Sequence, residues 1–201
     1  IEEIARCRGV PVAVALRLNF DTGFTEPWNR FGFNLESGQA REAIATIKAS
    51  PHLRLVGLHS HIGTFILDPR AYAVQVKILC ALMQEIEADG STRLDYLDIG
   101  GGLPSRNALH GTYLPPEQAV PDLDEYVEAI CAAFLEGAAY RLENGGQRPT
   151  LIFESGRAVI DDAQVLIASV VGRKQLPDGV PAVILDAGIN LLFTAFWYNH
   201  Q

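Results

Sequence analysis

Cysteines are few in this sequence, and long apolar runs are missing. The three cysteines, Cys7, Cys80 and Cys131, are widely separated and form no Cys-x-x-Cys pair. Neither a disulfide framework nor a structural zinc site is therefore indicated, and a reducing cytoplasm fits. No stretch reaches the roughly 18 consecutive apolar residues of a membrane-spanning helix, and no basic segment leads into an apolar one. We expect a cytoplasmic protein that is neither inserted in a membrane nor secreted.

Basic residues are also in the minority. Sixteen lysines and arginines stand against 24 aspartates and glutamates, which gives a formal net charge of −8. This balance argues against a nucleic acid or an anionic membrane surface as the partner. With 48% apolar residues among 201, the chain can bury a substantial core in one or two domains. A small molecule is therefore the expected partner.

Short apolar runs alternate with longer amphipathic segments. The runs predict buried strands, and the segments between them, with apolar residues at helical spacing, predict helices. The expected strands cover residues 12–19, 55–61, 94–99 and 150–154, and the expected helices cover 1–7, 39–49, 69–88 and 122–142. This alternation indicates a parallel sheet, and strand starts about 40 to 55 residues apart are typical of a β/α barrel. Four such units would form half of a barrel.

The residue types change after Gly156. Runs rich in β-branched residues predict strands over 163–171 and 180–185, with the turn-forming LPDGVP between them. We place a domain boundary at 158/159. The predicted fold class is α/β: residues 1–158 form half of a TIM-type (β/α)8 barrel of about four β/α units, and residues 159–201 begin a C-terminal β domain.

Reactive and anion-binding residue types gather where three of the predicted strands end. The second strand ends in HSHIGT at 59–64, the third in DIGGG at 98–102 and the fourth in ESGR at 154–157. In β/α barrels, the carboxyl ends of the strands carry the functional residues. We therefore expect these three segments to contribute to one site.

Each segment also has a purely structural interpretation. His59 and His61, at i and i+2, share one face of a strand, where a structural histidine is about as common as a ligand. Glycines are favoured in any tight strand-to-helix turn, and Glu154 with Arg157 could form a surface ion pair. Together the segments indicate more, because the N–H groups of residues 100–102 can cradle a phosphate and Arg157 can add a bidentate charged contact. The combination predicts a phosphate site.

Four segments resemble the alanine-racemase-like, fold type III enzymes that use pyridoxal 5'-phosphate (PLP), in particular the ornithine, diaminopimelate and arginine decarboxylase group. They are GLHSHIGT at 57–64, LDIGGGLP at 97–104, FESGR at 153–157 and ILDAGINLL at 184–192, in the family's order. One departure is Ser155, where the family commonly has proline. The resemblance implies the second half of a PLP-binding barrel. It also implies that the intact protein is a carboxy-lyase that decarboxylates an amino acid or an amino-acid-derived substrate.

The resemblance assigns cofactor roles to residues at the strand ends. His61 matches the histidine that stacks on the cofactor ring, and Thr64 matches a hydroxyl near the phosphate. Glu154 matches the acid that pairs with the pyridine nitrogen and keeps it protonated, so that the ring can accept the electrons released with CO2. Glu154 and His61 are the expected catalytic residues, and no metal is expected. The expected cofactor-binding residues are His61, Thr64, Gly100, Gly101, Gly102, Glu154, Gly156 and Arg157.

Two residues after the predicted boundary match substrate-side positions of the family. Asp186 matches an acid that faces the substrate side chain or amine, although an aspartate before Ala187 and Gly188 is equally suited to a turn. Tyr198 matches a tyrosine near the pocket in the diaminopimelate branch. That branch usually has an arginine for the substrate's distal carboxylate where this chain has Thr194. We therefore expect a related decarboxylase, for example of siderophore or other specialised-metabolite biosynthesis, and the family further implies a homodimer with a shared active site.

The family's cofactor-binding lysine has no counterpart in this sequence. That lysine lies on an early barrel strand, upstream of every segment seen here. The lysines present are Lys48, Lys77 and Lys174, predicted in two helices and a basic turn. We expect the chain to be an internal piece of a larger enzyme that cannot catalyse alone. A non-catalytic pseudo-decarboxylase retained for binding is the alternative.

A metal-dependent barrel hydrolase is a rival from another class. It would use His59 and His61 as a ligand pair and would need further ligands at later strand ends, where Asp98 and Glu154 qualify. The triple glycine would have no role in such an enzyme.

Overall fold

The chain forms two compact units in a computed structural model that describes residues 1–106, 113–161, 163, 165–191 and 193. The first, which we call the sheet unit, comprises 1–104 and 121–159, and the second comprises 105–120 and 160–201 within those limits. The second unit thus includes 105–120, which the sequence analysis assigns to the barrel half. The division into barrel and β domain at 158/159 stays a prediction. None of the described helices is both long enough and apolar enough to cross a membrane.

A parallel sheet forms the frame of the sheet unit. Its strands are β1 (Val12–Asn19), β2 (Phe33–Asn34), β3 (Leu53–Ser60), β4 (Tyr96–Asp98) and β5 (Thr150–Ile152). They lie in the order β2-β1-β3-β4-β5, and every neighbouring pair is parallel. The predicted α/β class and the parallel order of the four expected strands are confirmed. The edge strand β2 was not predicted, because two residues are too few to show an alternation.

Helices lie before, between and after the strands of this sheet. They are α1 (Glu2–Arg8), α2 (Gln39–Ala49), α3 (Pro69–Glu87), α5 (Leu123–Gly137), α6 (Ala139–Glu143) and α7 (Arg157–Ile160). The side chain of Asp68 caps α3 by accepting the Arg70 N–H, and Asp122 with Glu125 forms a capping box on α5. The single helix predicted over 122–142 is wrong, because the chain leaves the helical conformation at Ala138, just after the poor helix former Gly137.

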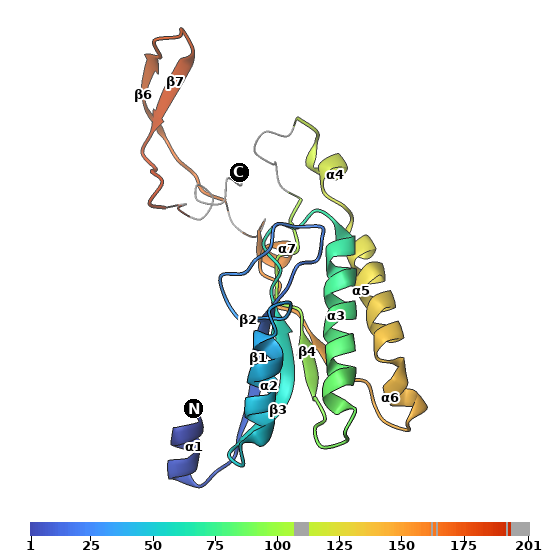
Figure 1. Cartoon of the computed structure of the whole chain (residues 1–201). Coiled ribbons are helices and arrows are strands. Elements are labelled where there is room, and N and C mark those ends of the chain that lie inside the picture. The colour runs from blue at the N-terminus through green and yellow to red at the C-terminus, as the bar shows by residue number, and fades with distance from the viewer. Residues whose placement is uncertain (107–112, 162, 164, 192, 194–201) are drawn as a thin grey trace. The chain divides into compact units, whose positions relative to one another are not determined.

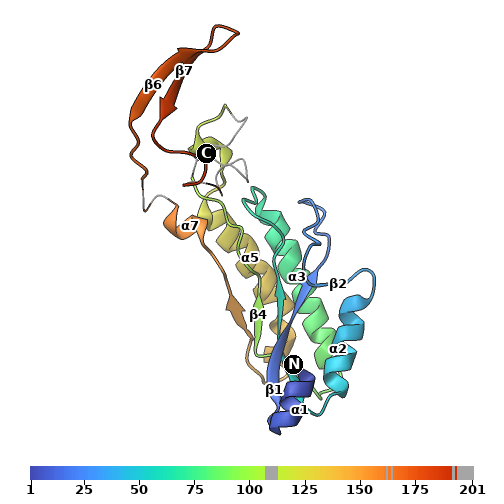
Figure 2. The same cartoon turned by 90° about the vertical axis from the view of Figure 1, so that its left-hand side faces the viewer.

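The apolar core lies between the sheet and helices α2, α3 and α5, which cover the same face of it (Figures 1 and 2). Burying each aliphatic side chain contributes about 1.5–3 kcal/mol, so this layer holds the strand ends in fixed positions. Its members from the strands include Leu16, Leu18, Leu58 and Leu97, and those from the helices include Ile44, Val76, Leu79 and Ile130.

The second unit contains α4 (Pro116–Ala119) and an antiparallel hairpin of β6 (Val170–Gln175) and β7 (Pro181–Leu185). The strand predicted over 163–171 is largely wrong, since β6 begins only at Val170. The position of β6 along the chain is determined by its pairing with β7, because the turn at Gly179 places Gln175 opposite Pro181. Lys174, predicted in a basic turn, is consequently part of β6.

The loops after β4 and β5 approach so closely that Gly101 has no room for a side chain. A Cβ added at Gly101 would lie 2.5 Å from the backbone oxygen of Glu154. A Cβ at Gly102, where φ is +97°, would collide with the backbone oxygen of Gly63 in the loop after β3. Steric contact between three loops therefore demands glycine at both positions.

A buried ion pair joins α3 and α6 at the other end of the strands. Arg141 is 4% and Glu87 11% exposed at the side chain, and the guanidinium donates to both Glu87 carboxylate oxygens. Glu87 also accepts from the Tyr140 hydroxyl at 2.6 Å and from the Leu94 N–H at 2.8 Å. Arg141 in turn donates to the Leu94 carbonyl at 2.7 Å, so the pair fixes the segment that leads into β4.

The Glu87 carboxyl gives the fold a defined dependence on acid. Burial raises its pKa, but the hydrogen bonds from Arg141, Tyr140 and the Leu94 N–H outweigh burial and bring the pKa below its ordinary value of 4.5. Such a group stabilises the fold fully above its unfolded-state pKa and loses that contribution as pH falls through the folded-state pKa. Glu87→Gln in the intact protein should therefore lower the free energy of unfolding at neutral pH, by roughly 1–3 kcal/mol.

Urea unfolding at a series of pH values checks this prediction. The difference between Glu87→Gln and the native protein should shrink as pH falls below 4.5. The exposed Glu143, replaced by Gln, serves as the control and should change little at any pH. If Glu87→Gln lowered the free energy of unfolding by the same amount at every pH, the prediction would be contradicted.

The contact between the loops after β4 and β5 predicts a second stability effect. Gly101→Ala should destabilise the intact protein by about 1–3 kcal/mol, because the new methyl group meets a backbone oxygen that cannot move alone. Gly156→Ala is the matched control in the same loop region, since a Cβ there would meet nothing within 4 Å. Denaturant titration measures both variants. Equal stability of the two would show that the loops do not meet as described.

Candidate functional site

A row of polar side chains crosses the sheet face that points away from the helices. Arg17 on β1 pairs in register with His59 on β3, and His59 pairs with Asp98 on β4. Residues in register share a face, and their sequence neighbours Leu16, Leu58 and Leu97 point into the helix-covered core instead. Glu154 follows β5 by two residues, so the row continues to the end of that strand.

A cavity of about 200 Å³ opens where the strands end. It is lined by His61, Thr64, Gly101, Gly102, Leu103, Glu154, Gly156 and Arg157. Seven of the eight predicted cofactor residues thus come together, although they are spread over almost a hundred positions of sequence. Gly100 does not line the cavity, and Leu103 was not predicted. The roles assigned to these residues stay predictions.

The glycine loop does not offer three N–H groups to a ligand. The Gly100 N–H donates to the Asp98 carboxylate at 2.9 Å, and the Gly101 N–H donates to His61 Nδ1 at 3.2 Å. Only for the Gly102 N–H do the described residues show no acceptor. The predicted cradle of three successive amides is therefore reduced to Gly102, which Gly156 N–H and Arg157 can supplement.

His61 is held as a neutral imidazole. Burial lowers its pKa most, and the neighbouring Arg17 and His59 lower it further against a smaller opposing effect of Glu154. Because Nδ1 accepts the Gly101 N–H, the ring proton belongs on Nε2. The rings of Trp28 and His61 make a T-shaped contact, with a centroid distance of 6.0 Å and an angle of 84° between their planes. Trp28 was not predicted as part of the site, because no motif near it in the chain points to His61.

Three side chains of the polar row lie within reach of one another. One ligand atom each of His59, Asp98 and Glu154 falls within 4.8 Å of the others, the sole such group in the part of the chain that the structure describes. The rival hydrolase interpretation pairs His59 with His61 as ligands, but His61 is not part of this group. Strand β3 ends at Ser60, so the two-residue alternation no longer applies at His61, whose Nδ1 accepts the Gly101 N–H.

Two buried residues of α3 donate hydrogen bonds to the ends of β3 and β4. Neither was predicted as part of the site. The Gln75 amide donates to the carbonyls of Ser60 and Ile99 at 3.0 and 2.9 Å and to the Ser60 hydroxyl at 2.8 Å. The Tyr72 hydroxyl donates to the Gly101 carbonyl at 3.1 Å. Buried polar residues within a helix that is otherwise apolar on that face are the signal that could have identified them.

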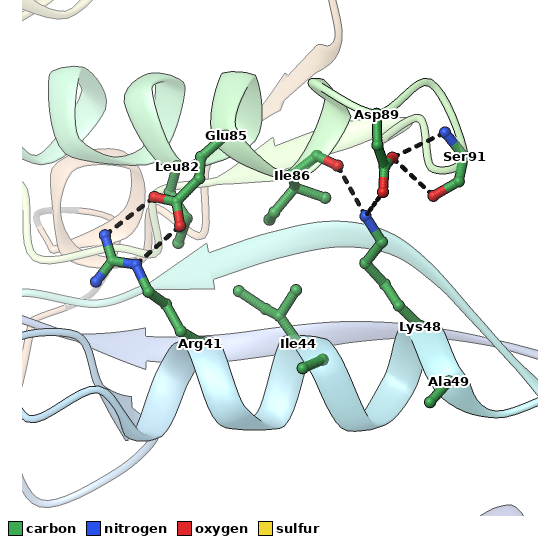
Figure 3. Close-up of a pocket in the computed structure, with 10 residues that line it drawn as sticks. Arg41, Ile44, Lys48, Ala49, Leu82, Glu85, Ile86, Asp89 and Ser91 are labelled. Atoms are coloured by element: carbon green, nitrogen blue, oxygen red, sulfur yellow. Dashed lines mark hydrogen bonds and ion pairs between the residues drawn. The ribbon is translucent and has the colours of Figure 1, made fainter.

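A larger cavity lies on the outside of the helical layer, between α2 and α3. It measures about 560 Å³, with Ile44, Leu82 and Ile86 between two ion pairs (Figure 3). Arg41 pairs with Glu85 at 2.8 Å, and Lys48 with Asp89 at 2.9 Å. We assign the function to the smaller cavity because parallel β/α proteins bind ligands at the carboxyl ends of their strands.

Neither lysine of the sheet unit lies at the smaller cavity. Lys48 on α2 donates to Asp89 and to the Ile86 carbonyl at 3.1 Å, and together with Ser91 it holds the pKa of Asp89 far below its usual range. Lys77 on α3 lies 3.8 Å from Glu136. Both occupy helices, as predicted.

Of the two predicted substrate residues, the structure describes one. Asp186 accepts the Ser169 N–H at 2.8 Å through its side chain, and its own N–H donates to the Ser169 carbonyl at 3.1 Å. These bonds close the base of the β6–β7 hairpin, which supports the structural interpretation of Asp186. Tyr198 lies outside the described residues, as does Thr194.

Comparisons with known proteins agree with the fold. A family model described as pyridoxal-dependent decarboxylase, pyridoxal binding domain, matches residues 1–161. The diaminopimelate decarboxylase of Bacillus subtilis (strain 168) is 30% identical over 167 residues, which are 81% of this chain and 35% of that protein.

Solved structures give the same result. The diaminopimelate decarboxylase of M. jannaschii matches with a TM-score of 0.76 and 25% identity, over 94% of this chain and 42% of that one. The lysine decarboxylase of Selenomonas ruminantium matches with a TM-score of 0.74 and 25% identity, over 98% and 48%. This chain thus spans less than half the length of these relatives.

These likenesses confirm the predicted fold class, part of a barrel followed by the start of a β domain. The family match is also broad, since it includes every strand of the parallel sheet and every residue of the cavity. The chain therefore belongs to the pyridoxal-dependent decarboxylases and carries most of its length in their pyridoxal-binding domain.

Proposed function

We propose that the intact protein decarboxylates an amino acid with the help of PLP. The observation that carries this proposal is the cavity at the strand ends, which combines an acid, a neutral imidazole and a guanidinium: Glu154, His61 and Arg157. These are the groups that a pyridine nitrogen, an aromatic ring and a phosphate would each require. The family to which the chain belongs supports the same cofactor.

The residues present fit the phosphate end of PLP. Arg157 would supply a charged, bidentate contact, and Thr64 a hydroxyl. Backbone N–H groups of Gly102 and Gly156 would complete the set, since their glycines leave the backbone accessible in the cavity. The phosphate would therefore be bound by side chains and N–H groups from several loops, rather than by three successive glycine N–H groups.

The residues also fit the ring of PLP. A neutral His61 can lie against an aromatic ring without adding a charge next to it, and its hydrogen bond from Gly101 limits its rotation. The Glu154 side chain is 56% exposed and can turn toward the cavity. Bound PLP supplies a ring that accepts the electron pair released with CO2. Glu154 holds the proton on the pyridine nitrogen that makes this possible, and His61 shields one ring face from water.

The cofactor-binding lysine is, in this proposal, supplied from outside these 201 residues. Lys48 and Lys77 are engaged on helices α2 and α3. A pseudo-decarboxylase that binds without reacting remains the alternative, and the intact gene distinguishes the two. Covalent trapping of PLP by borohydride on an upstream lysine supports the enzyme, whereas its absence supports the binding protein.

We propose an α-amino acid as the substrate. Diaminopimelate decarboxylases of M. jannaschii and Helicobacter pylori have been crystallised with L-lysine, which supports a substrate of this class. Thr194 stands where the diaminopimelate branch usually has arginine. A substrate without a distal carboxylate, as in siderophore or other specialised-metabolite assembly, therefore fits better. A cytoplasmic homodimer with a shared active site belongs to the same proposal.

A metal-dependent hydrolase is the second candidate, because His59, Asp98 and Glu154 lie within 4.8 Å of one another. It would use Glu154 as a metal ligand rather than as the partner of a pyridine nitrogen. Elemental analysis of the purified intact protein separates the two, since a hydrolase of this kind requires a stoichiometric metal and no PLP.

Substitution of Arg157 and of Glu154 should impair the intact enzyme in different ways, the first through PLP affinity and the second through kcat. Arg157→Ala removes a charge-assisted phosphate contact of roughly 1.5–3 kcal/mol, so PLP affinity should fall about ten- to a hundredfold, and excess PLP should restore the rate. Glu154→Gln keeps the size of the side chain but no longer favours a protonated pyridine. PLP should then still bind while kcat falls, and added PLP should not help.

A PLP titration followed by rate measurement at saturation tests both variants. Arg148→Ala provides a matched arginine control, because Arg148 is exposed and precedes β5, at the opposite end from the cavity. It should behave as the native enzyme does. Equal rescue of Arg157→Ala and Glu154→Gln by PLP would remove the electronic role from Glu154 and reduce it to a structural residue.

A further inference from the structure

Two nitrogens of the polar row, Arg17 Nε and His59 Nε2, are buried without a hydrogen bond to the described residues, and the second lies beside an acid. His59 Nε2 is inaccessible to solvent and has no hydrogen-bond partner among the described residues, although the whole side chain is 15% exposed. Its nearest acidic neighbour is Glu154 Oε2 at 3.6 Å, just beyond hydrogen-bond distance. A buried polar atom left without a hydrogen bond destabilises the fold, so a small movement that closes this gap is favourable.

Glu154 is the group free to make that movement. The Asp98 carboxylate is tied to the Gly100 N–H at 2.9 Å, whereas the Glu154 side chain is 56% exposed and follows the end of β5. The guanidinium of Arg17, on the other side of His59 in the sheet, lies 5.1 Å over the Phe31 ring. Two carboxylates within 4.8 Å favour His59 as a donor rather than an acceptor.

We propose that His59 is a positioning residue for Glu154. Its Nε2–H donates to one carboxylate oxygen of Glu154 and leaves the other oxygen directed to the cavity, where the pyridine nitrogen is proposed to lie. This inference rests on the proposed PLP function. It gives the two histidines of the HSH segment separate tasks: His61 lies against the ring, and His59 orients the acid that serves the ring nitrogen.

The position of His59 suits this task better than a metal site. The cationic Arg17 is its register neighbour on β1, and a positive charge beside the group opposes binding of a metal cation. A carboxylate that accepts two hydrogen bonds, one from the protein and one from the cofactor, is held in a single orientation. Rigid placement of a group that acts only along the reaction path raises kcat rather than binding.

A double-mutant cycle in the intact holoenzyme tests the proposal. His59→Leu removes the donor and should lower kcat about tenfold at saturating PLP and substrate, while KM and PLP affinity stay unchanged. His59→Gln places an amide N–H near the position of Nε2 and should restore most of the rate. In the Glu154→Gln background, His59→Leu should have no further effect, because the two residues act as one unit.

His52→Leu is the matched control, since His52 precedes β3 at the opposite end from the cavity. It should leave kcat unchanged. If His59→Leu does not fold, His59→Asn takes its place, because the shorter amide cannot reach Glu154 from the Nε2 position.

The outcomes separate this inference from the proposed function. A loss of kcat that is equally large in both Glu154 backgrounds would overturn the positioning role, as would stoichiometric zinc that His59→Leu abolishes. Full activity of Glu154→Gln would instead overturn the assignment of Glu154 in the proposed function. A normal kcat for His59→Leu beside a slow Glu154→Gln would refute the inference alone.

Discussion

The close packing of the loops after β3, β4 and β5 is the constraint on which the site depends. Gly101 touches the Glu154 backbone, and Gly102 touches the backbone of Gly63, so three segments far apart in the sequence become one surface. Gln75, from beneath, donates to the ends of β3 and β4 together. With no room for adjustment, the direction of each side chain above these loops is set by the backbone below it.

The same packing determines the electrostatics of the cavity. Burial and the neighbouring Arg17 keep His61 neutral, and the Gly101 N–H fixes which nitrogen carries the proton. Glu154, by contrast, stays half exposed at the rim. A neutral imidazole ring and a half-exposed carboxylate beside it form a suitable environment for an aromatic cofactor whose nitrogen must be protonated. The glycines contribute mainly by allowing this approach, since two of their three N–H groups are already bonded within the protein.

The two ends of the strands differ in how fully their charged and polar side chains are hydrogen-bonded. The ion pair of Arg141 and Glu87 closes the end where β4 begins, with every carboxylate oxygen hydrogen-bonded. Buried charges of this kind hold the fold only when fully satisfied. At the cavity end, Arg17 Nε and His59 Nε2 are instead buried without a hydrogen-bond partner in the part of the chain that the structure describes. Unpaired buried groups of this kind support the proposal of a ligand site at that end.

The sequence by itself determined the four main strands, the parallel sheet, the strand-end segments and the decarboxylase family, because periodicity, glycine position and short motifs are local properties. The tertiary structure alone decided that the N–H groups of Gly100 and Gly101 donate hydrogen bonds to Asp98 and His61. It likewise decided that His59 and His61 diverge at the end of β3. The position of β6 was settled by its partner strand, not by its own residues. Each of these features depends on which distant atom lies within hydrogen-bond reach, and no local pattern in the chain encodes that.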